Sequence, residues 1–168
     1  GSELVQLLND NADICIGAAC SPEKHVESPS LDQDVLATRQ KVDAGASFLI
    51  TQLFFDNSRY LDFVAHARAA GIGVPIVPGI MPITNVDQVT RFTAKIGASI
   101  PDALRAALQA RADDAAAVLQ LGVAWATLQC SELLRAGAPG IHFITLNRSP
   151  ATRAILAALR IARPWEHR

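Results

Sequence analysis

The sequence has little of what marks disulfide-stabilised, metal-stabilised or nucleic-acid-binding chains. Its 168 residues include three cysteines, Cys15, Cys20 and Cys130, and none of them forms a CxxC pair. An odd count without paired spacing argues against a disulfide framework or a structural zinc site, so we expect a reducing, cytoplasmic compartment and three small buried side chains. The net charge of −1 supplies no basic field for phosphates, which argues against a general nucleic-acid binder.

Aromatic residues and long hydrophobic runs are also scarce. Aromatics make up 5% of the chain, so aliphatic and alanine-rich packing must build the core. The longest apolar stretch, residues 69–83, is interrupted by glycines and prolines and is too short for a membrane span of about 20 residues. The chain opens on Gly-Ser without Met or a leader pattern, which predicts a processed, tagged or excised piece.

Half of the residues are apolar, and short β-rich runs alternate with longer helical runs. Ser30 and Asn57 are expected to cap two of the helices, and Gly45 is expected to end the first one. Alternation of this kind predicts βα units with a parallel sheet and helical crossovers. The expected strands are residues 13–20, 47–54, 74–79 and 141–145; the expected helices are 31–44, 57–70, 86–96, one with Pro101 in its first turn, 113–135 and 151–161.

Two architectures accommodate four βα units. A doubly wound open sheet needs nothing further, whereas a (β/α)₈ barrel typically needs about 250 residues, so four units would form only half of it. A free half-barrel would expose two strand edges, which invites pairing with another chain. In both architectures ligands bind beyond the carboxyl ends of the strands. The polar or turn-forming residues expected there are Ser21, Glu23, His25, Glu27, Thr51, Gln52, Gly79, Pro82, Asn85, Asn147 and Arg148.

Gln52 interrupts a run that is otherwise almost wholly apolar. A buried amide is costly unless its donors and acceptor are matched, so either neighbouring backbone satisfies it or it hydrogen-bonds the amide-like edge of a heterocycle. Asp34 and Lys41 lie seven residues apart and therefore on one helix face. They form either an exposed ion pair through an intermediate residue or a polar strip facing a ribose or phosphate.

Several other patterns do not carry a function. Gly71 and Gly73 precede an expected strand and lack the third glycine of a dinucleotide fingerprint. His25 and Glu27 have no second histidine near them in sequence, so no metal site is expected. Ser149 lacks the G-x-S-x-G setting of a hydrolase nucleophile.

These candidate loops carry four strings: PEKH (22–25), KVDAGASFLITQLFFDNSRYLDF (41–63), VPIVPGIMPITN (74–85) and HFITLNRS (142–149). Together they closely resemble the bacterial methylenetetrahydrofolate reductase family. The resemblance is colinear over nearly all 168 residues. It implies a (β/α)₈ TIM-barrel fold in which residues 1–168 form a single domain, corresponding to barrel units five to eight. It also implies reduction of 5,10-methylenetetrahydrofolate to 5-methyltetrahydrofolate by NAD(P)H through FAD, in one-carbon and methionine metabolism.

The resemblance also assigns roles to particular residues. The flavin-contacting positions correspond to His25, Asp34 and Lys41, with Glu27 in the same segment. The positions that contact the folate or the nicotinamide correspond to Gln52, Gln88, Phe92 and Arg148. The expected partners are therefore folate and NAD(P)H, and the family suggests a homo-oligomer or pairing with an amino-terminal half.

Departures from the family pattern concentrate on the flavin side. Ser21 stands where relatives usually have an aromatic residue, Ala37 and Gln40 replace polar or basic positions, and Ile144 replaces a frequent tyrosine. The family's general acid belongs to the first barrel strand, so no catalytic residue is expected in this segment and the chain alone is expected to be inactive. The alternative is a non-catalytic truncated paralogue, or a half-barrel module that binds flavin or folate only on assembly.

Overall fold

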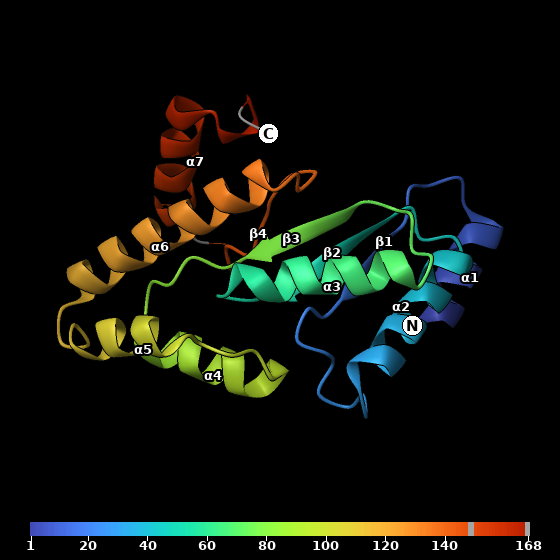
Figure 1. Ribbon diagram of the computed structural model, residues 1–168, viewed down its shortest axis with the longest axis horizontal. Helices are drawn as coiled ribbons and strands as arrows, with labels where there is room; N and C mark the ends of the chain where they lie inside the picture. Colours follow the sequence, from blue (N-terminus) through green and yellow to red (C-terminus); the bar gives the residue numbers. More distant parts are fainter. Residues whose placement is uncertain (148–149, 167–168) are drawn as a thin grey trace.

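Four parallel strands form one sheet whose spatial order follows the sequence, β1-β2-β3-β4 (Figure 1). This computed structural model describes residues 1–147 and 150–166. The strands are β1 (Gly17–Cys20), β2 (Phe48–Leu53), β3 (Ile76–Ile80) and β4 (His142–Phe143). The helices are α1 (Ser2–Asn11), α2 (Leu31–Asp43), α3 (Asn57–Ala69), α4 (Val86–Ile96), α5 (Asp102–Gln109), α6 (Ala115–Arg135), α7 (Pro150–Ala162) and the 3₁₀ turn η1 (Pro164–Glu166). Helical crossovers between parallel strands confirm the predicted α/β class.

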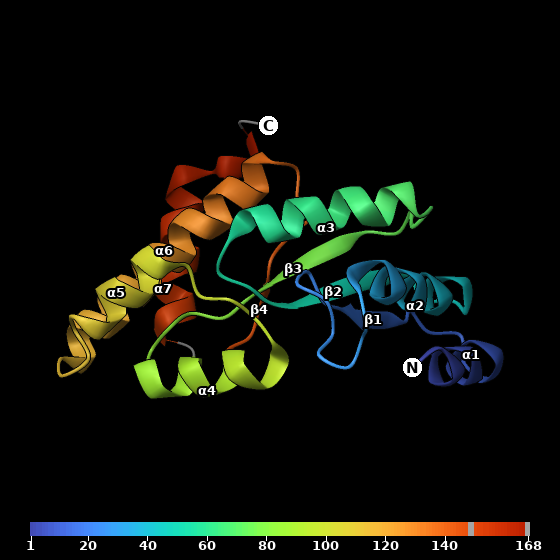
Figure 2. The same cartoon turned by 60° about the horizontal axis from the view of Figure 1, so that its bottom comes forward.

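One face of the sheet is covered by helices and holds the main core. Leu49 of β2 and Ile76 of β3 pack in one cluster with residues of α2, α3, α6 and α7. In Figure 2, α2 and α3 run along the sheet, while α6 lies beside α7. Tyr60 of α3 donates its hydroxyl to the carbonyl of Ile76 at 2.8 Å, and its burial raises the pKa of that hydroxyl to about 12. The polar tip of this core residue is therefore satisfied by the strand it covers.

The opposite face of the sheet, called the open face below, carries Ala19, Phe48, Ile50, Gln52 and Val77. These side chains are half-buried or exposed, whereas the alternate positions of β1 and β2 are buried. None of the five belongs to either core cluster. Because side chains alternate between the two faces of a strand, this difference means that the described helices cover one face far more than the other.

A second core lies beyond the carboxyl ends of β2 and β3, where α4, α5 and α6 meet. Gly122 of α6 lies so close to the carbonyl of Ile83 that a β-carbon there would clash with it. By length and composition, α6 passes as a helix that could cross a membrane. Its buried residues, however, pack into both cores, so it serves here as a core helix.

Local sequence signals place most helix starts correctly. Ser30 accepts a hydrogen bond from the amide of Gln33, and Gly45 adopts the expected left-handed conformation with φ of 115°. The expectation that Asn57 caps α3 is wrong: the preceding Asp56 accepts from the amide of Ser58, leaving Asn57 free to reach α6. Pro101 likewise occupies the cap position before α5 and not its first turn.

The strand boundaries and one cysteine also differ from expectation. β1 begins at Gly17, because its partner Phe48 is the first residue of β2 and residues before Gly17 have no strand beside them. β4 is reduced to two residues for the same reason, since β3 ends at Ile80. Cys15 falls in the unpaired segment and is exposed. Cys20 and Cys130 are buried as expected, and desolvation raises the pKa of each thiol to about 12. Helix α1 had no counterpart in the sequence prediction.

Candidate functional site

Gln52 lies at the carboxyl end of β2 with its side chain exposed on the open face. Among the described residues its amide has no hydrogen-bond partner, so the backbone does not satisfy it. Next to it, Thr51 points the other way, is buried, and accepts the amide of Gly79 at 2.8 Å through its hydroxyl. This bond falls where the β2–β3 register shifts. The shifted register thus places the Thr51 hydroxyl against the amide of Gly79. The Gln52 side chain keeps its amide oxygen and its amide nitrogen free to bind a ligand.

Asp34 and His25 are brought together by the loop between β1 and α2. The Asp34 carboxylate is buried in the first turn of α2, and its Oδ2 accepts the backbone amide of His25 at 3.0 Å. The imidazole remains exposed, with Nδ1 3.3 Å from the amide nitrogen of Glu27 and 3.9 Å from its carboxylate. Asp34 thus fixes the backbone of the loop that presents His25 and Glu27.

Lys41 does not pair with Asp34. Its ammonium donates to the carbonyl of Ala19 in β1 at 2.9 Å, which leaves two of its three donor hydrogens without a partner in the part of the chain that the structure describes. The expectation of an exposed ion pair is therefore wrong, because each group has found a backbone partner elsewhere. The lysine instead places a positive charge beside β1, at the sheet's first strand.

On the other side of the strand ends, α4 carries Gln88 and Phe92. Asn85 caps α4 by accepting the amide of Gln88 at 2.8 Å. The Gln88 side chain lines a narrow cleft of about 20 Å³ with Met81 and Ile144, at the ends of β3 and β4. Phe92 is half-buried and packs against the second core. The structure therefore gives Phe92 a packing role, while Gln88 reaches the cleft.

The loop of His25 and the segment that follows α4 are tied together by Glu23. Its carboxylate accepts the amide of Ser99 at 3.1 and 3.2 Å and the Ser99 hydroxyl as well, and it lies 3.9 Å from the Arg59 guanidinium. Val26 also packs close to Gly97 at the end of α4. The sequence places Glu23 among the polar candidates but offers no spacing signal for a partner 76 residues away.

Arg148, expected on the folate side, lies outside the described residues. Within residues 1–147 and 150–166 no cluster of three or more histidine, cysteine or carboxylate side chains could hold a metal ion. The site is thus a set of hydrogen-bonding groups arranged along the carboxyl ends of β1, β2 and β3.

The family model described as methylenetetrahydrofolate reductase matches residues 1–160. The chain is 39% identical over 160 residues to the 5,10-methylenetetrahydrofolate reductase of Escherichia coli, covering 95% of this chain and 54% of the relative. It is 35% identical over 160 residues to methylenetetrahydrofolate reductase 1 of Schizosaccharomyces pombe, covering 94% of this chain and 26% of that one. The chain thus spans about half the length of the bacterial relative.

A solved structure shares the fold at low sequence identity. It is described as an uncharacterized protein from Clostridium thermocellum that binds two copies of 5-methyl-5,6,7,8-tetrahydrofolic acid. The TM-score is 0.61 at 20% identity, and the match covers 96% of this chain and 59% of that one. The fold is therefore shared with a protein of only 20% sequence identity. On the family match and the identities above, the chain belongs to the methylenetetrahydrofolate reductase family.

Proposed function

We propose that the chain forms the carboxyl-terminal half of a (β/α)₈ barrel that reduces 5,10-methylenetetrahydrofolate to 5-methyltetrahydrofolate with FAD and NAD(P)H. The observation that carries this proposal is Gln52, an amide at a strand's carboxyl end with no partner among the described residues. An unpaired amide can accept from and donate to a pterin or a nicotinamide, since both present an amide-like edge. The family relationship supports folate as the substrate class.

The uneven coverage of the sheet supports the half-barrel. Phe48, Ile50 and Val77 stand outside both core clusters on the open face. Strands β1 and β4 are each paired on one side only. Four further βα units would pair both edges and bury this face, as the interior of a closed barrel is buried. Such units would come from an amino-terminal half or, in a homo-oligomer, from another chain.

The groups on the flavin side suit FAD in their chemistry. Lys41 has donor hydrogens left for a phosphate oxygen, and His25 presents an exposed imidazole. Asp34 has one carboxylate oxygen, Oδ1, without a partner in the described structure, and this oxygen could accept from a ribityl or ribose hydroxyl. Bound FAD would relay hydride from NAD(P)H to the folate. The part of residues 1–168 would be to bind and orient both ligands, because the resemblance assigns the general acid to the first barrel strand, which does not correspond to any of these residues.

On the folate side, Gln52 would orient the pterin and Gln88 would add a second amide from α4. Arg148 is proposed to pair with a carboxylate of the substrate. Phe92 is proposed to stack its ring on whichever ligand is bound. Glu23 would hold the flavin-side loop at a fixed distance from the segment that ends α4. Each residue named in this proposal therefore binds or positions a ligand, and none of them transfers a proton.

The test compares the chain alone with the chain co-expressed with the portion of the Escherichia coli relative that the match leaves uncovered. We expect the assembly to carry flavin absorbance that NADH or NADPH bleaches without oxygen, and to turn over 5,10-methylenetetrahydrofolate, whereas the chain alone is inactive. Gln52→Ala should lower turnover at least about tenfold, the loss expected for a hydrogen-bond pair to a ligand, while flavin absorbance persists. Gln120→Ala, an exposed amide on α6, is the matched control.

Each contrary outcome bears on a separate part of the proposal. A colourless assembly that still reduces the folate would overturn the assignment of FAD. An assembly that binds flavin but has no turnover would favour the non-catalytic alternative. If Gln52→Ala and Gln120→Ala are equally active, Gln52 is not a substrate-binding residue.

A further inference from the structure

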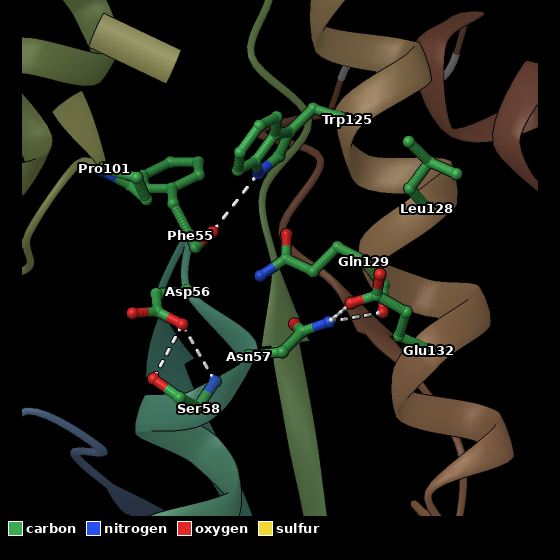
Figure 3. A pocket seen from close by; sticks show the side chains of 9 residues that line it. All are labelled: Phe55, Asp56, Asn57, Ser58, Pro101, Trp125, Leu128, Gln129 and Glu132. Carbon is green, nitrogen blue, oxygen red and sulfur yellow. Dashed lines mark hydrogen bonds between the residues drawn. The ribbon is translucent and has the colours of Figure 1, made fainter. Parts of the chain in front are cut away.

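A cavity of about 440 Å³ lies between α6, the start of α5 and the segment that follows β2 (Figure 3). Its lining residues come from the segment after β2, the residue before α5, and α6, and they do not include Gln52. Its volume falls in the range of small-molecule pockets. Phe55 and Trp125 form an aromatic wall, and the indole Nε1 of Trp125 donates to the carbonyl of Phe55 at 3.2 Å. Because the indole is anchored by this bond, one part of the pocket is rigid and apolar.

A nearly buried amide reaches into this pocket from α6. Gln129 is 5% exposed, and its Nε2 donates to the carbonyl of Phe54 at 2.9 Å. Its Oε1 has no hydrogen-bond partner among the described residues, and in Figure 3 the amide extends into the space between Trp125 and Asn57. The donor is fixed by Phe54, so the free oxygen presents an acceptor to whatever occupies the pocket.

The remaining polar lining is acidic. Glu132 accepts the amide nitrogen of Asn57 at 2.8 Å through Oε2 and keeps its other oxygen free in the described structure. The carboxylate of Asp56 accepts from Ser58 and lies 4.0 Å from Arg59, so its charge is partly offset. None of the described residues that line the pocket is lysine, arginine or histidine. The pocket therefore combines acceptors and negative charge with an aromatic wall.

We propose that this pocket binds a small organic cation, an ammonium group attached to an apolar or aromatic body. The ammonium would donate to Gln129 Oε1 and to the free oxygen of Glu132; the lining holds a further unmatched acceptor, the buried Oδ1 of Asn57. The apolar body would lie against Trp125 and Leu128, which supply the apolar part of the lining. The site is distinct from the proposed folate and flavin groups, so it can exist whether or not those assignments hold.

The test is a titration with 2-phenylethylammonium, with 2-phenylethanol and phenylacetate as the neutral and anionic analogues. A Trp165→Phe background leaves Trp125 as the only tryptophan, so its fluorescence reports occupancy of the pocket. We expect saturable binding of the cation, with binding of the neutral analogue weaker by about tenfold, the loss of one charge-assisted hydrogen bond. Calorimetry on the same samples gives the stoichiometry, expected to be one site per chain.

Two variants with matched controls locate the site. Glu132→Gln keeps an acceptor for Asn57 but removes the charge, and it should weaken cation binding about tenfold, whereas Asp62→Asn, an exposed carboxylate on α3, should not. Leu128 is 65% exposed, so Leu128→Lys can place a competing ammonium at the pocket without disturbing the core, and it should also weaken cation binding. Leu119→Lys, on the same helix, should leave cation binding unchanged.

Three results would overturn the proposal. They are equal affinity for the cation and the neutral analogue, absence of saturable binding in a chain whose circular dichroism shows it to be folded, and equal losses in Glu132→Gln and Asp62→Asn. The first would leave only an apolar pocket, and the last would indicate a general charge effect.

Discussion

At the residue scale, Gly122 determines how closely α6 approaches the loop after β3. A β-carbon at Gly122 would overlap the carbonyl of Ile83, which is backbone and cannot rotate away. Gly122→Ala should lower the free energy of unfolding by about 1–2 kcal/mol, because overpacking costs about 1–3 kcal/mol and removing a helical glycine returns up to about 1 kcal/mol. Urea denaturation monitored by circular dichroism measures the change.

The control for this substitution is Ala124→Gly, at an exposed position of the same helix. It should cost about 1 kcal/mol from helix propensity alone. A Gly122→Ala chain more stable than the wild type would mean that propensity decides at this position and that the close approach does not constrain α6.

Particular residues show which features of the candidate site could be predicted from the sequence. Gln52 could be singled out because it is a polar residue in an apolar run, but the burial assumed for its amide is wrong, since the side chain is exposed, and its role in binding stays a prediction. The pairing of Asp34 with Lys41 could not be settled by spacing. Their actual partners, the amide of His25 and the carbonyl of Ala19, depend on how the loop and β1 fold against α2. Side-chain partners across elements are tertiary facts that periodicity does not contain.

At the scale of elements, the carboxylate of Glu23 joins the loop after β1 to the segment after α4. Removing its charge by Glu23→Gln should lower the free energy of unfolding by about 1.5–3 kcal/mol, the usual worth of hydrogen bonds to a charged group. A double-mutant cycle with Ser99→Ala should give a coupling energy of about 1 kcal/mol between the two residues.

Glu27→Gln, on the same loop but exposed, is the control and should change the free energy of unfolding by less than about 0.5 kcal/mol. A coupling energy of zero would show that Ser99 and Glu23 stabilise the chain independently.

The ends of elements explain which boundaries sequence patterns can locate. Helix starts are set by caps within a few residues, so Ser30 could be identified locally, and the errors at Asn57 and Pro101 are each small shifts at a helix start. Strand ends depend on the neighbouring strand instead. β4 is short because β3 ends at Ile80, and no property of residues 141–145 encodes that limit.

At the scale of the whole molecule, the half-covered sheet makes a prediction about self-association. Phe48, Ile50 and Val77 form an apolar surface between strands with unpaired edges, a combination that promotes pairing between chains. The isolated chain should therefore show a sedimentation coefficient that rises with concentration. Ile50→Lys places a charge at the centre of this surface and should reduce the rise. It should also leave the free energy of unfolding within about 0.5 kcal/mol of the wild-type value, since Ile50 belongs to neither core.

Leu61→Lys, at an exposed position of α3, tests whether any added lysine has this effect and should leave association unchanged. A wild-type chain that stays monomeric at all concentrations would mean that the open face is stable in contact with water. Four covering units would then not be needed to bury it.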